Sequence, residues 1–198
     1  FAYGGYADLC NVQNWNLDFV KKSKQGSDFK ILANRISECL NFMDACGINN
    51  KNVRQITETS FFISHEALLL PYEEAFTRID STTGDWYDVS AHMVWIGDRT
   101  RQLDGAHVEF CKGISNPIGI KIGPSANPDE ILKLIKIINP NNEEGKIVLI
   151  VRMGAKSIKN LYPPILRKIK KSNLNVTWSC DPMHANTEKA KSGYKTRN

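Results

Sequence analysis

Four strand-like apolar runs in the chain each end near a side chain that could bind or activate an anionic substrate. The first ends on Asp98 and Arg99, the second on Lys121, the third on Arg152, and the fourth leads to His184. The interval between successive ends is long enough for a helix and two loops. A (β/α)8 barrel builds its active site from polar groups at the carboxyl ends of successive strands. The spacing therefore predicts an anion-binding site of this kind.

The three cations suit a small polyanion that carries both a carboxylate and a phosphate. Arg99 and Arg152 present planar forks that match either group, and Lys121 offers a point charge. The alternative is three separate salt bridges, for which the nearby acids are Asp98, Glu109 and Asp104. Each cation taken alone fits the structural role better. Their shared position at strand ends favours a role in binding an anionic substrate.

His184 is a candidate metal ligand or general base, because a neutral imidazole at a strand end commonly serves in either role. A lone histidine is more often neither, but the rigid Pro182 just before it favours a functional role. Asp98 could either orient its neighbour Arg99 or hold a water molecule near the substrate. Trp95 fits a pocket wall and core packing equally well.

The elements that must position these groups follow from periodicity and capping signals. Helices are predicted over 27–47, 72–79, 105–110, 128–138 and 164–171, and strands over 59–64, 93–96, 118–121, 147–151 and 176–180. His65 and Glu66 follow the first strand, so either could face the site. Ser27 and Asn127 are predicted helix caps, and Pro71 and Pro128 suit first helical turns.

Strands that alternate with helices imply βαβ units and a parallel sheet, so the fold class is α/β. Strands near 118, 147 and 176 are almost continuously apolar, as parallel strands buried on both faces are. Five strands are too few for a closed barrel. An open doubly wound sheet is the alternative, with its site also at the strand ends. The abrupt ends lead us to expect a single incomplete (β/α)8 domain over 1–198, truncated on both sides.

Composition narrows the class of protein. The net charge of +5 includes one basic run, Arg167 to Lys171, which reads as a solvated helix face, because no aromatics interleave as nucleic-acid binding would favour. Five cysteines without a C-x-x-C pair indicate a reducing compartment, hence a cytoplasmic protein. Cys111 and Cys180 read as buried small hydrophobes. No run is long enough to span a membrane.

The longest motif is WIGDRTRQLDGAHVEF at 95–110. Shorter motifs lie in order over 4–9, 64–70, 116–124, 152–154, 181–184 and 195–197. Together they resemble the signature of the type II 3-deoxy-D-arabino-heptulosonate 7-phosphate (DAHP) synthases across essentially the whole chain.

The resemblance implies a (β/α)8 barrel, of which this chain would cover about strands three to seven. It implies a transferase that condenses phosphoenolpyruvate with erythrose 4-phosphate and water, releasing phosphate, in the first step of the shikimate pathway to aromatic amino acids. It further implies a divalent metal, Mn or Co, a homo-oligomer, and a cytoplasmic (or, in a plant, plastid) location. A chorismate mutase partner stays open, as does the alternative of an inactive truncated barrel with a binding or regulatory role.

By resemblance, Asp98, Arg99, Lys121 and Arg152 bind phosphoenolpyruvate, the first three also acting in catalysis, His184 binds the metal, and Glu66 and Trp95 lie near the substrate. The family's other metal ligands, a Cys, a Glu and an Asp, are expected outside 1–198, so the fragment alone should be inactive. Ala185 stands where the family commonly has glycine, a change expected to be tolerated if the backbone there needs no positive φ.

Overall fold

The computed structural model describes residues 8–14 and 26–197. The chain divides into two compact units, Phe1–Phe61 and Phe62–Asn198. The expectation of a single incomplete barrel domain over 1–198 stays a prediction. Most of the motif at 4–9 lies outside the described residues.

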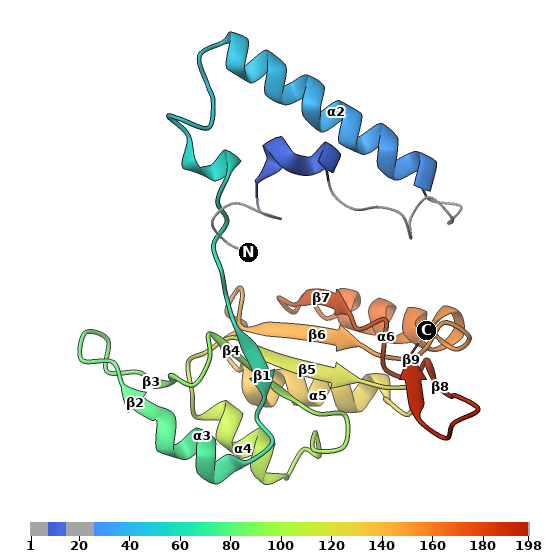
Figure 1. The fold of residues 1–198 in the computed structure, drawn as a ribbon. Coiled ribbons are helices and arrows are strands. Elements are labelled where there is room, and N and C mark those ends of the chain that lie inside the picture. The colour runs from blue at the N-terminus through green and yellow to red at the C-terminus, as the bar shows by residue number, and fades with distance from the viewer. Residues whose placement is uncertain (1–7, 15–25, 198) are drawn as a thin grey trace. The chain divides into compact units, whose positions relative to one another are not determined.

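The N-terminal unit contains the 3-10 helices η2 (Leu9–Asn14) and η3 (Arg54–Ile56) and the helix α2 (Gly26–Ala45) (Figure 1). The long helix confirms the prediction for 27–47, although it begins before the expected cap Ser27. Its apolar residues at helical spacing are mostly half-buried, and Leu32 is exposed. The predicted buried face is therefore only partly covered within this unit.

The second unit is built on a five-stranded parallel sheet, which confirms the α/β class. Its strands are β1 (Ser64–Glu66), β4 (Met93–Ile96), β5 (Ile118–Ile122), β6 (Ile147–Val151) and β7 (Thr177–Cys180). Their order in the sheet is their order in the sequence (Figure 1). A doubly wound sheet reverses its strand order at a switch point, and the described strands contain no such reversal.

The first strand lies later than predicted. The run Phe61-Phe62-Ile63 is apolar enough to resemble a strand, but these residues are exposed, and parallel pairing begins with Ser64 opposite Met93. The other four strands match their predicted positions within two residues.

Four helices accompany the sheet, namely α3 (Leu70–Phe76), α4 (Ala106–Lys112), α5 (Pro128–Ile138) and α6 (Ile158–Lys171). Helix α5 begins as predicted, since the Asn127 side chain accepts hydrogen bonds from the backbone N–H groups of Asp129 and Glu130. Helix α6 begins six residues earlier than predicted. Pro163 and Pro164 lie inside it, and Leu161 N donates to Ser157 O in its first turn.

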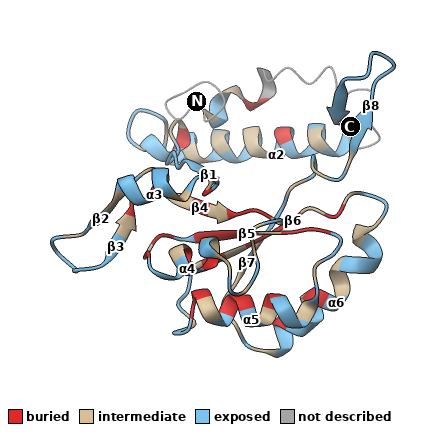
Figure 2. Cartoon of the chain, turned by 90° about the horizontal axis from the view of Figure 1, so that it is seen from below, coloured by how far each residue is buried: buried red, intermediate tan, exposed pale blue. Residues whose placement is uncertain are grey.

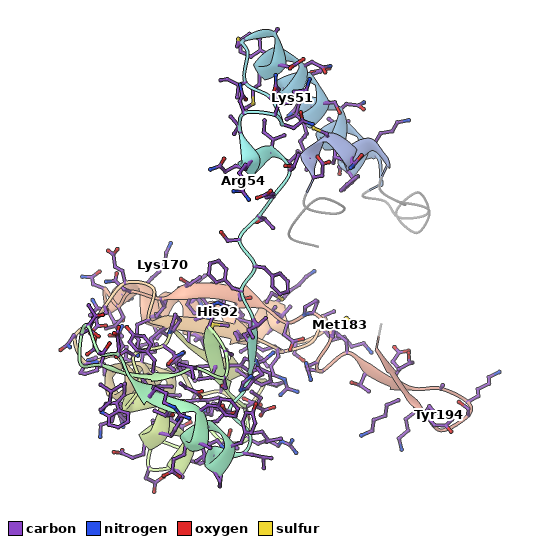
Figure 3. All side chains as sticks on the ribbon, turned by 60° about the vertical axis from the view of Figure 1, so that its left-hand side comes forward. Lys51, Arg54, His92, Lys170, Met183 and Tyr194 are labelled. Atoms are coloured by element: carbon purple, nitrogen blue, oxygen red, sulfur yellow. The ribbon has the colours of Figure 1, made fainter. Side chains whose placement is uncertain are left out.

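Two short antiparallel hairpins were not predicted. The first pairs β2 (Thr77–Ile79) with β3 (Trp86–Asp88), so α3 ends at Phe76 instead of continuing to Ile79. The second pairs β8 (Thr187–Lys189) with β9 (Lys195–Arg197), and Tyr194 extends from it, 78% exposed (Figure 3). The predicted turn over 82–85 connects β2 and β3.

The core lies between the sheet and the helices α4, α5 and α6, which cover one of its faces (Figure 2). Alternate strand residues and one face of each helix are fully buried, including Val94, Ile96, Ile120, Ile122, Leu149, Leu134, Ile135 and Ile165. Cys111 is buried there as predicted, whereas Cys180 is exposed, which makes that prediction wrong. Strand β7 is mostly exposed as well, so burial on both faces does not extend to it. None of the helices in the described part of the chain is long and apolar enough to cross a membrane.

Candidate active site

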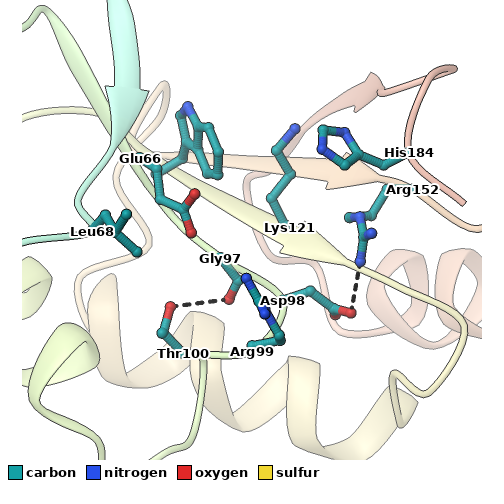
Figure 4. Close-up of a pocket in the computed structure, with 10 residues that line it drawn as sticks. Glu66, Leu68, Gly97, Asp98, Arg99, Thr100, Lys121, Arg152 and His184 are labelled. Atoms are coloured by element: carbon teal, nitrogen blue, oxygen red, sulfur yellow. Dashed lines mark hydrogen bonds and ion pairs between the residues drawn. The ribbon is translucent and has the colours of Figure 1, made fainter. Parts of the chain in front are cut away.

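The carboxyl ends of the parallel strands surround a cavity of about 520 Å³ (Figure 4). All seven side chains singled out from the sequence line it, namely Glu66, Trp95, Asp98, Arg99, Lys121, Arg152 and His184. The strand ends therefore bring together residues that are widely separated along the chain. Their individual roles stay predictions.

Strand register explains which side chains face the cavity. Glu66 lies opposite Trp95, and residues in register on parallel neighbours point to the same face of the sheet. His65, one position earlier, points away, and its Nε2 lies 2.9 Å from Oε1 of the buried Glu73. Of the two candidates after the first predicted strand, Glu66 is the pocket residue, and His65 belongs to a partly buried polar cluster with Glu73 and Ser90.

Asp98, at the pocket wall, binds two arginines, of which Arg152 lines the pocket and Arg101 lies outside it. Its Oδ2 accepts a hydrogen bond from Arg152 Nη1 at 3.1 Å, and its Oδ1 accepts from Arg101 Nε at 3.1 Å and Gly123 N at 2.8 Å. A side chain at Gly123 would collide with this carboxylate. Of the two roles predicted for Asp98, that of orienting Arg99 is wrong, because its carboxylate binds Arg152 and Arg101 instead. The other, holding a water molecule near the substrate, stays a prediction.

Lys121 is held by Asp181, a residue for which no role was predicted. Its Nζ donates to Asp181 Oδ2 at 2.6 Å, and it lies 4.6 Å from the centre of the Trp95 ring. The same Asp181 oxygen lies 2.6 Å from His184 Nδ1. The sequence did offer a signal, since an aspartate a few residues before a backbone N–H group commonly accepts its hydrogen bond in a turn. Asp181 Oδ1 does so from Met183 and His184.

The protonation state of Asp181 follows from these contacts. Partial burial acts to raise the pKa of its carboxyl. The hydrogen bonds from the Lys121 ammonium and from His184 outweigh burial, and the net effect holds this pKa well below its ordinary value. The carboxylate is therefore ionised throughout the neutral range and can pair with Lys121.

Arg99 differs from the other two cations. Its side chain is exposed, and its guanidinium has no hydrogen-bond or ion-pair partner within 8–14 and 26–197. Lys121 and Arg152 do form salt bridges, with Asp181 and Asp98 as partners, so only Asp98 of the three predicted acids takes part. Two cations are fixed at the pocket wall, and the third is free to meet an anion.

The described residues contain no group of three or more His, Cys, Asp or Glu side chains that could hold a metal ion. His184 nevertheless has the arrangement of a single ligand. Its Nδ1 is engaged by Asp181, which leaves Nε2 as the nitrogen with a free position. A divalent metal therefore fits here only as an ion that takes one ligand from these residues.

Comparisons with known proteins agree on one family. All of residues 1–198 match the model of the Class-II DAHP synthetase family. A phospho-2-dehydro-3-deoxyheptonate aldolase of Streptomyces coelicolor is 53% identical over 197 residues, which cover 100% of this chain and 43% of the relative. A Catharanthus roseus protein named probable phospho-2-dehydro-3-deoxyheptonate aldolase, chloroplastic, is 53% identical over 182 residues, with 92% and 37% covered. A Mycolicibacterium smegmatis aldolase of the same name is 46% identical over 198 residues, with 98% and 42% covered. The chain spans less than half the length of each relative.

Proposed function

The chain belongs to the class-II DAHP synthetase family, and we propose that the complete protein containing it is a 3-deoxy-7-phosphoheptulonate synthase. That transferase condenses phosphoenolpyruvate, erythrose 4-phosphate and water into DAHP and phosphate, and opens the shikimate pathway. The observation that carries the proposal is the convergence of Arg99, Lys121 and Arg152 on one cavity in a chain that matches the family throughout.

We propose that the sheet is an arc of a (β/α)8 barrel, about strands three to seven. Sequential strand order and helices on one face support this, since a barrel winds in one direction with all its helices outside. The pocket at the carboxyl ends of the strands is where such a barrel carries its active site.

Phosphoenolpyruvate carries a carboxylate and a phosphate, and the three cations match that pair of groups. Arg152 and Lys121 are pre-positioned by Asp98 and Asp181, so substrate binding orders few further side chains. Arg99 can bind the substrate without first breaking an ion pair, because no acidic side chain in the described residues contacts its guanidinium. As the carbon–oxygen bond to phosphate breaks, these cations stabilise the negative charge that develops on the leaving group.

His184 would contribute its Nε2 to a divalent metal, Mn or Co by family resemblance, whose other ligands would come from parts of the complete protein outside this chain. When bound, such a metal supplies Lewis-acid polarisation of the erythrose 4-phosphate aldehyde. Asp98 would act through Arg152 and Arg101, because its oxygens already accept three hydrogen bonds. Glu66 and Trp95 would form further parts of the pocket wall, with the Trp95 ring next to Lys121.

The homo-oligomer, the chorismate mutase partner and the cytoplasmic or plastid location also stay predictions. The word chloroplastic belongs to the name of the Catharanthus roseus relative.

Arg152→Ala in the complete protein tests the function. The Michaelis constant for phosphoenolpyruvate should rise roughly 10- to 100-fold, the usual cost of a lost charge-assisted hydrogen bond. Arg167→Ala, on the solvent side of α6, is the control. An unchanged constant for phosphoenolpyruvate would exclude Arg152 as a ligand, and absence of DAHP formation by the wild-type protein would overturn the proposed function.

A further inference from the structure

One oxygen atom contacts both parts of the proposed site, namely Lys121 of the phosphoenolpyruvate subsite and His184 of the metal site. Asp181 Oδ2 accepts a hydrogen bond from Lys121 Nζ at 2.6 Å and lies 2.6 Å from His184 Nδ1. The Asp181 side chain is only 10% exposed, and that of Lys121 only 12%. Figure 4 shows the Lys121 ammonium and the His184 ring next to each other at the edge of the pocket.

The contact to Asp181 selects the tautomer of His184. A lysine ammonium can only donate, so Oδ2 acts as the acceptor for Lys121, and the ring nitrogen that shares this oxygen, His184 Nδ1, carries the proton. With the proton on Nδ1, the neutral ring keeps its lone pair on Nε2. A carboxylate that orients a metal-binding histidine in this way usually tightens metal binding.

The loop that carries the Asp181 carboxylate is held by several hydrogen bonds of its own. Asp181 Oδ1 accepts from the backbone N–H groups of Met183 and His184, both at 3.1 Å. Asn186 Nδ2 donates to Pro182 O at 2.7 Å. The two oxygens of Asp181 thus have separate roles. Oδ1 accepts the backbone hydrogen bonds of the loop, and Oδ2 contacts Lys121 and His184.

We propose that Asp181 is a positioning residue that couples the two binding sites. Through Oδ2 it sets His184 to present Nε2 to the metal and holds Lys121 at the phosphoenolpyruvate subsite. Loss of that one acceptor weakens metal binding and phosphoenolpyruvate binding together. The inference rests on the proposed function.

Asp181→Asn separates this role from that of a loop anchor. The amide oxygen can keep the place of Oδ1 and its two backbone hydrogen bonds. The amide nitrogen then replaces Oδ2 and presents a donor to Lys121 and His184. His184 meets that donor by accepting at Nδ1, which moves its proton to Nε2 and removes the lone pair from the metal side.

Asp129→Asn is a matched control. Asp129 Oδ1 lies 2.6 Å from Lys168 Nζ, the same separation as in the Lys121–Asp181 pair. It lies at the exposed start of α5, and its side chain is 66% exposed. Both substitutions remove one charge from a lysine–aspartate pair, and only one of these pairs borders the pocket.

The experiment measures three quantities in the complete wild-type protein and both variants. They are the dissociation constant of Mn²⁺ by electron paramagnetic resonance, that of phosphoenolpyruvate by calorimetry, and the His184 tautomer by ¹⁵N NMR of the metal-free protein at pH 8. Asp181→Asn should weaken Mn²⁺ binding roughly 10- to 100-fold and phosphoenolpyruvate binding about tenfold. Its His184 should carry the proton on Nε2, and Asp129→Asn should match the wild type.

Wild-type binding of both ligands, with Asp181→Asn unchanged in either, would overturn the inference and leave the proposed function standing. A wild-type protein that binds neither ligand would instead refute the proposed function. If Asp181→Asn does not fold, the wild-type NMR spectrum still decides, because a proton on Nε2 of neutral His184 contradicts the positioning role.

Discussion

Arg152 Nη1 lies 3.1 Å from Asp98 Oδ2, although the two residues are 54 positions apart in the sequence. Asp98 follows β4 and Arg152 follows β6, so the ion pair reaches across the end of the intervening strand β5. The backbone N–H of Gly123, just after β5, donates to the same carboxylate at 2.8 Å. One aspartate therefore ties together the ends of three consecutive strands.

Gly123→Ala should disrupt this arrangement without changing any charge. An added methyl group would overlap the Asp98 carboxylate and displace it from Gly123 N and Arg152. We expect a loss of about 1–3 kcal/mol in the free energy of unfolding, and a higher Michaelis constant for phosphoenolpyruvate. Urea unfolding and steady-state kinetics measure the two effects. Gly113→Ala, where the nearest atom is 3.4 Å away, should be neutral in both.

Arg99→Ala should weaken substrate binding without lowering the stability of the protein. Because the Arg99 guanidinium has no partner in the described part of the chain, its loss should change the free energy of unfolding by less than about 0.5 kcal/mol. Affinity for phosphoenolpyruvate should fall roughly 10- to 100-fold. Arg101→Ala is the contrast, since that side chain is 11% exposed and paired with Asp98, so it should destabilise the protein. An Arg99→Ala protein with normal substrate affinity would remove Arg99 from the site.

Local sequence signals predicted the longer helices and most strands of the parallel sheet but not the contacts between them. The cap at Asn127 and the apolar strand runs lie within a few residues of the structure they specify. The Lys121–Asp181 pair, by contrast, joins residues 60 positions apart. It depends on strand register and on the β7 loop, which no local pattern encodes. The same reason explains why the two roles predicted for Asp98, to orient Arg99 or to hold a water molecule, did not include its ion pair with the distant Arg152.

Short strands were missed because three residues carry too little periodicity. Thr77-Arg78-Ile79 continues the helical pattern of α3, and only its pairing with Trp86-Tyr87-Asp88 makes it a strand. The choice between His65 and Glu66 was open for a related reason. Adjacent residues of a strand face opposite sides, and the sequence did not reveal which side was the pocket.

Ala185→Gly should stabilise the loop after β7. Ala185 adopts a φ of 63°, the left-handed region, so the condition for tolerating alanine at this position is not met. Glycine relieves the strain of this conformation, but it also gives the unfolded chain more conformational freedom. The net effect should raise the free energy of unfolding by about 0.5 kcal/mol. A thermal melt measures the change. Gly154→Ala faces the same loop at a φ of 73° and would place its methyl carbon 2.8 Å from Ala185 O, so it should lower the melting temperature. If both variants shift the melting temperature equally, or if Ala185→Gly lowers it and Gly154→Ala raises it, strain at Ala185 does not limit the stability of this loop.

Cys111 should make the stability of the protein fall at alkaline pH. Burial raises the pKa of its thiol from 9.0 to about 12. Between these values the unfolded chain releases a proton that the folded protein retains. Because the folded state binds more protons, the free energy of unfolding decreases as pH rises through this window.

At pH 10 the expected loss from Cys111 is about 1.4 kcal/mol relative to pH 7. Cys111→Ala removes this contribution, although its cavity lowers stability at every pH. The test is therefore the difference between pH 7 and pH 10 in urea unfolding, which should be smaller for Cys111→Ala than for the wild type. Cys39→Ala, at an exposed cysteine of α2, should keep the wild-type difference. If Cys111→Ala keeps it too, the thiol is accessible to ionisation in the folded protein and the packing of α4 against the sheet must be looser than the structure indicates.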